Sequence, residues 1–165
     1  MIPKKKKRRT GLSPKYLDDL WSKAIKKRDG YKCVLCPSGS VLESHHVVHR
    51  RQNWVLRWNI KNGITLCKMC HDLADTLQFK NLIAMHVDME YLADIEMRYP
   101  QKADFLIDRG MSEAEARKDF ADKLKKVINS RLKSATPFKL PTRGKVDRKG
   151  NLYLHYYFEK EINKQ

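Results

Sequence analysis

The chain of 165 residues lacks a long apolar run, a Gly/Ser-rich linker and an internal repeat, and it has few acidic residues. Because a membrane-spanning helix needs about 18 or more consecutive apolar residues, we expect none here. The basic N-terminus leads into Thr10-Gly11-Leu12-Ser13 instead of the apolar segment of a secretory signal, so we expect a protein that is not secreted. Hydrophobic residues make up 41% of the chain, which is enough to build a core.

The shortage of acidic residues dominates the charge of the chain. It holds 35 Lys and Arg residues against 19 Asp and Glu residues, for a formal net charge of +16. Such a charge favours a polyanionic partner, which leaves nucleic acid, an acidic membrane surface or an acidic protein. Residues 1–28 hold 11 basic and 2 acidic residues, and residues 136–165 hold 7 and 3, whereas the middle is nearly neutral. This distribution indicates a folded body with two basic extensions.

A run of six basic residues near the N-terminus is too self-repelling to fold alone. It consists of Lys4, Lys5, Lys6, Lys7, Arg8 and Arg9. We interpret it as a disordered arm that binds DNA phosphates, because each neutralised phosphate releases counterions and adds affinity that is independent of sequence. The alternative is a solvated tail that serves only solubility or localisation.

Ser, Pro and Gly residues divide the remaining chain into elements. Ser13-Pro14 predicts the start of a helix that closes near Gly30. The stretch 78–99 predicts one amphipathic helix that ends before a proline, and Ser112-Glu113-Ala114-Glu115 is typical of the capping box of another. The apolar positions of the stretch 78–99, at steps of three and four, are Leu82, Met85, Met89, Leu92 and Ile95. Alternating apolar residues around 147–151 predict a β-hairpin. The expected divisions are a disordered arm (1–12), a central domain (13–77), a helical extension (78–135) and a basic hairpin (136–165).

All four cysteines fall in two CxxC pairs, Cys33/Cys36 and Cys67/Cys70, with 30 residues between the pairs. Two disulfides would require an oxidising compartment, for which the sequence offers no secretion signal. A redox-active CxxC normally occurs alone. Two pairs suit a tetrahedral Cys₄ zinc site, because each pair presents two thiolates to one ion. We therefore expect a structural zinc ion, and four sulfur ligands leave it no open position for catalysis.

Histidines and one asparagine lie in order between and beside these pairs. His46 follows Cys36 after nine residues, Asn62 follows after fifteen more, and His71 comes directly after Cys70. Three motifs contain these residues: Arg28-Asp29-Gly30-Tyr31-Lys32-Cys33-Val34-Leu35-Cys36, Ser44-His45-His46-Val47-Val48, and Asn62-Gly63-Ile64-Thr65-Leu66-Cys67-Lys68-Met69-Cys70-His71. Together they resemble the HNH endonucleases of the His-Me-finger, or ββα-metal, superfamily over roughly residues 13–77.

The resemblance implies metal-dependent hydrolysis of DNA phosphodiester bonds. His46 would be the general base, because a histidine near its ordinary pKa can take a proton from water at neutral pH. His45 and His71 would hold one divalent ion, commonly Mg²⁺, Mn²⁺ or Ni²⁺, against the scissile phosphate and the departing 3′ oxygen. Asn62 would brace the loop and orient the base. With the flanking elements, we expect an α+β fold: a small ββα-metal HNH core held by a Cys₄ zinc site, flanking α-helices and a C-terminal β-hairpin.

Two positions depart from the family pattern. His45 stands where many members have Asp, and an imidazole ligand favours a softer ion such as Mn²⁺, Ni²⁺ or Zn²⁺. His49 stands where many have Pro, which leaves a third metal ligand, a phosphate donor or a plain surface residue as its role. His71 could instead complete a Cys₃His zinc set.

Several side chains between His49 and Asn62 suit nucleic acid. Arg50 and Arg51 are well placed to clamp a phosphate beside the metal. Trp54 and Trp58 are either core residues or stacking surfaces for unpaired bases.

The expected activity is that of a DNA endonuclease that nicks or cuts both strands. No helix-turn-helix or zinc-finger reader is evident in the sequence, so we expect loose sequence preference or recognition of DNA structure. A zinc-stapled DNA-binding or regulatory protein with an inactive HNH core is the alternative, and RNA stays open as a substrate. We expect no membrane partner, and the helices of 78–135 could form a homodimer interface. A phage or mobile-element origin would place the protein in the cytoplasm of a bacterial host.

Overall fold

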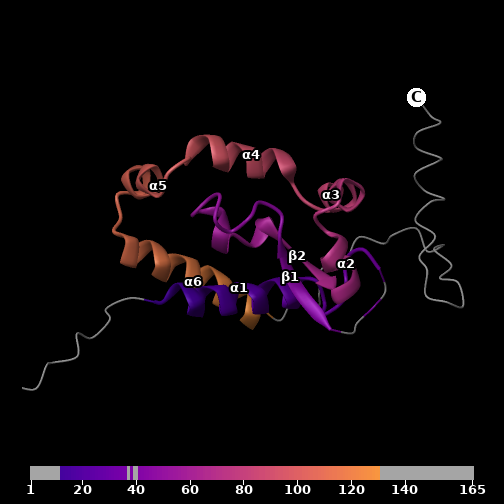
Figure 1. Ribbon diagram of the computed structural model, residues 1–165. Coiled ribbons are helices and arrows are strands. Elements are labelled where there is room, and N and C mark those ends of the chain that lie inside the picture. The colour runs from indigo at the N-terminus through magenta and orange to yellow at the C-terminus, as the bar shows by residue number, and fades with distance from the viewer. Residues whose placement is uncertain (1–11, 37, 39–40, 131–165) are drawn as a thin grey trace, which may run out of the picture. The chain divides into compact units, whose positions relative to one another are not determined.

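The computed structural model describes residues 12–36, 38 and 41–130 (Figure 1). The chain divides into two units, residues 1–135 and 136–165, and every described residue belongs to the first. Within that part, six α-helices accompany a two-stranded antiparallel sheet, which confirms an α+β fold. The basic arm of 1–12, except Leu12, and the hairpin of 136–165 lie outside the described residues. No helix in the described ranges is long and apolar enough to cross a membrane.

Helix α1 (Pro14–Arg28) begins and ends where the sequence predicts. The Ser13 hydroxyl accepts a hydrogen bond from the backbone N–H of Tyr16, and Pro14 occupies the first turn, where its missing N–H costs nothing. Gly30 follows the helix with a φ of 66°, a left-handed conformation that glycine adopts without strain. The helix buries one apolar face against the rest of the unit: Leu17, Leu20, Trp21, Ala24 and Ile25.

The sheet pairs strand β1 (Leu42–His46) with strand β2 (Gly63–Cys67). Their register sets Leu42 opposite Cys67 and His46 opposite Gly63. Two 3₁₀ turns, η1 (Leu56–Trp58) and η2 (Ile60–Asn62), lie in the connection between the strands. Helix α2 (Lys68–Leu73) starts directly after β2, so the order in the chain is strand, strand, helix.

The prediction of one helix over 78–99 is wrong, because the segment forms two helices. Helix α3 (Leu77–Ala84) ends at Met85, and helix α4 (Met89–Arg98) starts afresh after Asp88, whose carboxylate accepts a hydrogen bond from the N–H of Tyr91. This side-chain cap favours a new helix start over continuation. The break also changes the buried face: Met85 is 78% exposed, while Phe79 and Ile83 are buried.

Helix α5 (Lys102–Arg109) is an element that the sequence analysis missed. A capping box between Gln101 and Asp104 begins it, and Gly110 ends it in a left-handed conformation with a φ of 59°. Helix α6 (Glu113–Asn129) begins at the predicted capping box of Ser112 and Glu115.

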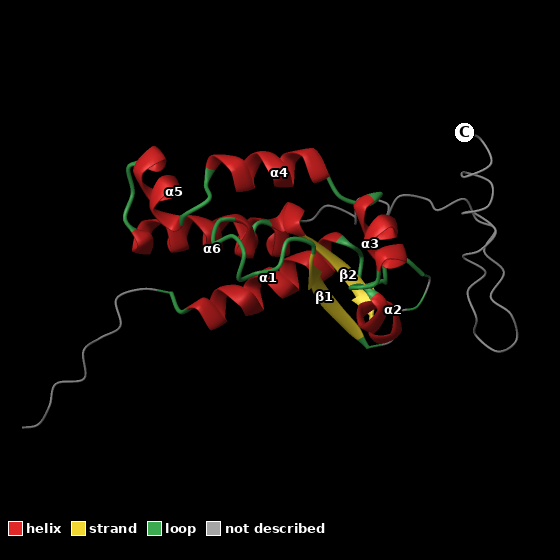
Figure 2. Cartoon of the chain, turned by 45° about the horizontal axis from the view of Figure 1, so that its top comes forward, coloured by secondary structure: helices red, strands yellow, loops and turns green. Residues whose placement is uncertain are grey.

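One core spans the expected boundary between 77 and 78. Helix α6 lies along α1 (Figure 2), and its apolar face contributes to the cluster that α1 and the η1 turn also line. Trp58, 2% exposed, is a core residue, which confirms that interpretation; Trp54 packs edge-on against it from the margin of the cluster. Helix α1 and the helices that follow the strand–strand–helix segment therefore pack around one core that supports this segment.

Candidate functional site

The four cysteines gather into one buried cluster. Their sulfur atoms all lie within 4.8 Å of one another, and all four are free thiols. The sulfur of Cys36 is 3.6 Å from that of Cys67 and 3.8 Å from that of Cys70. A tetrahedron with metal–sulfur distances of about 2.3 Å has edges of about 3.8 Å, so this spacing suits one central ion.

The ionisation of these thiols tests whether a metal fits. A hydrogen bond with Cys70 is the largest cause that lowers the pKa of Cys33 to about 5, and backbone N–H groups assist it against burial. Burial raises the pKa of Cys36 to about 12, and hydrogen bonding to Cys33 raises that of Cys70. Without a metal, Cys33 thus favours the thiolate while Cys36 and Cys70 favour the protonated thiol, and a central cation is what would ionise those two. The donor set fits a metal ion such as zinc.

The cysteine cluster joins two distant parts of the chain. Cys33 and Cys36 follow α1, Cys67 ends β2 and is the N-cap of α2, and Cys70 lies within α2. The N–H of Val34 also donates to the carbonyl of Thr65 at 2.9 Å, so backbone bonding reinforces the junction. An ion here would fix the start of α2, and with it the next residue, His71.

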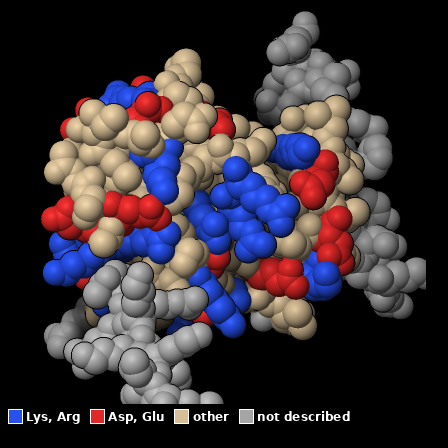
Figure 3. Space-filling view, turned by 60° about the vertical axis from the view of Figure 1, so that its left-hand side comes forward, with Lys and Arg blue, Asp and Glu red and all other residues tan. Residues whose placement is uncertain are grey.

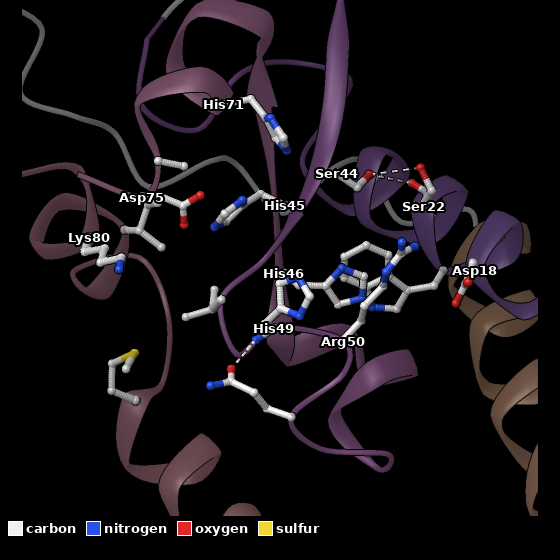
Figure 4. A pocket seen from close by; sticks show the side chains of 16 residues that line it. Asp18, Ser22, Ser44, His45, His46, His49, Arg50, His71, Asp75 and Lys80 are labelled. Atoms are coloured by element: carbon white, nitrogen blue, oxygen red, sulfur yellow. Dashed lines mark hydrogen bonds between the residues drawn. The ribbon is translucent and has the colours of Figure 1, made fainter. Parts of the chain in front are cut away.

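A separate open cleft of about 800 Å³ contains the predicted histidines. His45, His46, His49 and His71 all line it. Successive side chains of a strand point to opposite faces, and His45 contacts α2 while His46 contacts α1. Figure 4 shows His45 and His71 on one side of β1 and Ser44 with Ser22 on the other. The two neighbouring histidines therefore share one site because the cleft extends around both sides of β1.

His46 is held by two groups. Its ring stacks on the indole of Trp21, with centroids 3.7 Å apart and planes 10° from parallel. Its Nε2 lies 2.9 Å from the carbonyl oxygen of Arg57. A carbonyl only accepts, so Nε2 carries the proton and Nδ1 carries the lone pair. Burial lowers the pKa of His46, which favours the neutral imidazole at pH 7.

His45 and His71 approach each other edge-on. Their ring centroids are 5.4 Å apart at an interplanar angle of 81°. His71 Nδ1 lies 3.1 Å from a carboxylate oxygen of Glu43, which is on the same strand as His45. Burial, and then the proximity of His71, lower the pKa of His45 to about 4. The pair thus brings two imidazoles, a common type of metal ligand, next to each other. Among the described residues, however, only the cysteines form a group of three or more such ligands.

Asn62 is fully buried and braces the connection between the strands. Its side-chain carbonyl accepts from the N–H of Val48 at 2.7 Å. Its amide donates to the carbonyls of Val48 at 2.8 Å and Leu56 at 3.0 Å. These bonds fix the chain that leaves β1 just after His46. The amide is fully committed to the backbone, which agrees with a bracing role and leaves no donor for a substrate.

The basic residues near the cleft differ in position. Arg50 and Lys80 line the cleft, whereas Arg51 does not. Figure 4 shows Arg50 and Lys80 on opposite sides of the histidines, with Asp75 between Lys80 and His45. The N–H of His49 donates to Gln52, so its backbone belongs to a turn that presents the ring at the rim of the cleft. His71 lies with His45 and Glu43, and the cysteine cluster forms without it.

Sequence reasoning missed three residues that support the site. Trp21 counted only as an apolar position of α1. Asp18, one turn earlier, accepts two hydrogen bonds from the Arg57 guanidinium, at 3.0 and 2.7 Å, and one from the Trp58 indole at 2.8 Å. Burial raises the pKa of Asp18, but these donors outweigh it and hold the pKa below its usual value. The third residue is Glu43, which lies beside His71. Of the three, only Asp18 gave a signal in the sequence, because it is a carboxylate next to the apolar positions of a helix.

Comparison with protein-family models, curated proteins and solved structures gives no match to the chain.

Proposed function

We propose that the protein is a metal-dependent endonuclease that hydrolyses DNA phosphodiester bonds, with an HNH-type site and a structural zinc ion. The observation that carries the proposal is the state of His46. Its ring lines an open cleft, its Nε2 hydrogen is given to the Arg57 carbonyl, and burial favours its neutral form. Those are the requirements of a general base whose acceptor is Nδ1.

His46 would act on a water molecule in the cleft. Nδ1 takes one proton from the water while the oxygen forms a new bond to phosphorus. The bond from phosphorus to the 3′ oxygen breaks, and the 3′ oxygen leaves with a proton from solvent. Asn62 supports this step from a distance, because it fixes the loop that carries the Arg57 carbonyl and the end of β1.

His45 and His71 are the residues that would bind the catalytic divalent ion. Glu43 faces Nδ1 of His71, so Nε2 is the nitrogen that His71 offers. The bound ion would supply positive charge at the phosphate and at the departing oxygen. Two imidazole ligands favour Mn²⁺, Ni²⁺ or Zn²⁺ over Mg²⁺.

The charge of the chain supports a polyanionic substrate. The formal net charge is +16, and the cleft has a basic residue on each side of its histidines. Figure 3 shows Lys and Arg side chains gathered in the middle of one face, with acidic side chains on both sides of them. Phosphate contacts of this kind hold DNA without reading its sequence.

Plasmid cleavage tests the proposal. Supercoiled DNA is incubated with the protein and Mg²⁺, Mn²⁺ or Ni²⁺ in turn, and nicked and linear products are measured. We expect wild-type cleavage, and a loss of about 10²–10⁴-fold in His46→Ala. His86→Ala is the matched control, because His86 is another partly buried histidine and does not line the cleft.

Three outcomes decide the matter. Cleavage that survives in His46→Ala removes His46 as the base. DNA binding without cleavage under any ion favours the alternative of a DNA-binding protein with an inactive core. Preferential cleavage of an RNA duplex replaces the substrate while keeping the chemistry.

A further inference from the structure

The ring of His46 lies on a tryptophan that comes from another element. Trp21 belongs to α1 and His46 to β1, and their rings stack almost in parallel at 3.7 Å. Trp21 also borders the cleft, but only 2% of it is exposed. The indole is therefore the largely buried surface on which the imidazole lies.

A short stretch of the η1–η2 segment anchors both rings. The carbonyl of Arg57 accepts from His46 Nε2, and the carbonyl of Asn59 accepts from Trp21 Nε1, each at 2.9 Å. Asp18 binds the side chains of Arg57 and of the intervening Trp58, one turn of α1 before Trp21. The network closes on itself, because α1 carries the indole and also fixes the segment that holds the imidazole.

Gly63 has no side chain, and the indole of Trp21 occupies the space where one would lie. Gly63 stands opposite His46 in the strand register. A Cβ atom at this position would lie 2.3 Å from Cζ2 of Trp21 and 2.9 Å from Cδ1 of Ile25. The backbone of Gly63 is extended, with a φ of −148°, so glycine is required here for room and not for its conformation. A side chain at Gly63 would push the indole away from the sheet.

The two contacts of His46 constrain different motions of its ring. Stacking on a flat surface fixes the plane of the imidazole. The Arg57 hydrogen bond fixes its rotation within that plane. We propose that Trp21 is a positioning residue for His46, which holds the Nδ1 lone pair in one direction in the cleft. This inference rests on the proposed nuclease function of His46.

Substitution of Trp21 separates positioning from packing. Trp21→Phe keeps a flat aromatic ring, although a smaller one, and loses the Nε1 donor, whereas Trp21→Leu keeps an apolar side chain but loses the flat face as well as the donor. A displacement of about 1 Å can cost about 10²-fold in rate. We expect kcat for DNA cleavage to fall by about 10–100-fold in Trp21→Leu, with KM unchanged, and to recover largely in Trp21→Phe. Gly63→Ala should resemble Trp21→Leu, because it displaces the same indole.

Leu17→Ala is the control for lost packing. Leu17 is a fully buried residue of α1. Truncating it should lower the unfolding temperature and leave kcat unchanged at temperatures where the protein is folded. An equal loss of kcat in Leu17→Ala would overturn the positioning role and make Trp21 a packing residue only.

Proton NMR measures the stack without any cleavage assay. The ring protons of His46, assigned by their absence in His46→Ala, should be shifted upfield by the indole ring current. At one fixed pH, this shift should persist in Trp21→Phe and vanish in Trp21→Leu. A wild-type spectrum without the upfield shift would overturn the positioning role, whether or not the protein cuts DNA. A shift that vanishes while kcat stays at the wild-type value would also overturn it, and would leave the nuclease assignment standing.

Discussion

The cysteine cluster and the histidine cleft both take residues from the short strand–strand–helix segment but are built in opposite ways. The cluster has four identical donors, all buried, within 4.8 Å of one another. The cleft is open and mixes imidazole, carboxylate, hydroxyl and basic groups. Its key ring, His46, is held by groups from α1 and from the η1 turn.

The difference separates what a motif contains from what a fold must supply. A closed metal site is complete once its ligands meet, and each CxxC pair already brings two ligands together. An open site needs a ring at a defined angle, and that angle depends on supporting residues far away in the chain. We therefore expect substitutions in the cluster to unfold the protein, and substitutions in the cleft to lower the rate of the proposed DNA cleavage.

Loss of the cysteine cluster should have the largest effect. Binding of structural zinc contributes about 10–16 kcal/mol of apparent folding free energy in small zinc domains. Cys67→Ser, or removal of the metal with a strong chelator, should unfold the β2–α2 junction and abolish the wild-type thermal transition. Circular dichroism and zinc content measure this together. A variant that loses zinc but keeps the transition temperature would show that the cluster is dispensable for the fold.

Substitution of Asn62 should have the next largest effect, because this residue braces the chain beside the cleft and is buried like the cluster. Asn62→Asp retains an acceptor for Val48 but cannot donate to the carbonyls of Val48 and Leu56. The Leu56 carbonyl keeps its hydrogen bond from the N–H of Asn59, so the Val48 carbonyl is the group left unpaired. An unpaired buried group costs about 1–3 kcal/mol, and we expect a loss of that size in urea-induced unfolding. Asn81→Asp on the exposed side of α3 is the matched control and should be neutral. Equal stability of the two variants would contradict the bracing role.

The basic residues should have a smaller effect, confined to binding. Arg50→Ala and Lys80→Ala should each weaken DNA binding several-fold and lower the slope of log K against log salt by about 1, because each would remove one of the proposed phosphate contacts at the cleft. Arg51→Ala should change little, since Arg51 does not line the cleft. Fluorescence anisotropy with a short duplex at several salt concentrations measures this. A uniform effect of all three changes would mean that the cleft does not guide the DNA.

At neutral pH the titration of His45 has the smallest effect of these, and it appears only as the pH falls. Burial and His71 lower the pKa of His45 to about 4, whereas an unfolded histidine titrates near 6.5. Between these values the unfolded chain takes up a proton that the folded chain does not, so stability is full above pH 6.5 and falls towards pH 4. His45→Asn should make that fall shallower in thermal unfolding from pH 7 to pH 4. Identical curves for the variant and the wild type would rule out this contribution of His45.

Local signals in the sequence sufficed for much of the fold. Ser13-Pro14 and the Ser112–Glu115 capping box correctly marked two helix starts, and the CxxC pairs indicated the cluster. The break at Asp88 was missed because apolar residues continue across it at helical spacing. Only the competing Asp88 cap reveals that a new helix begins there.

The site was predictable in its motif residues but not in their support. The order of the histidines and Asn62 indicated which side chains to examine. It could not indicate that Trp21 lies against His46 or that Asp18 holds Arg57, because those contacts span 25 and 39 positions of the chain. Such contacts depend on long-range packing. The apolar pattern of a helix shows which residues are buried but not which side chain each of them contacts.

The direct succession of Cys70 and His71 on α2 has a practical consequence. Cobalt that replaces the metal among the four sulfurs would be coloured and paramagnetic. Its unpaired electrons would sit one residue away from the imidazole that faces the cleft. Metal or DNA entering the cleft would then be visible as a shift in the His71 resonances, so the closed centre would serve as a spectroscopic probe of the open one.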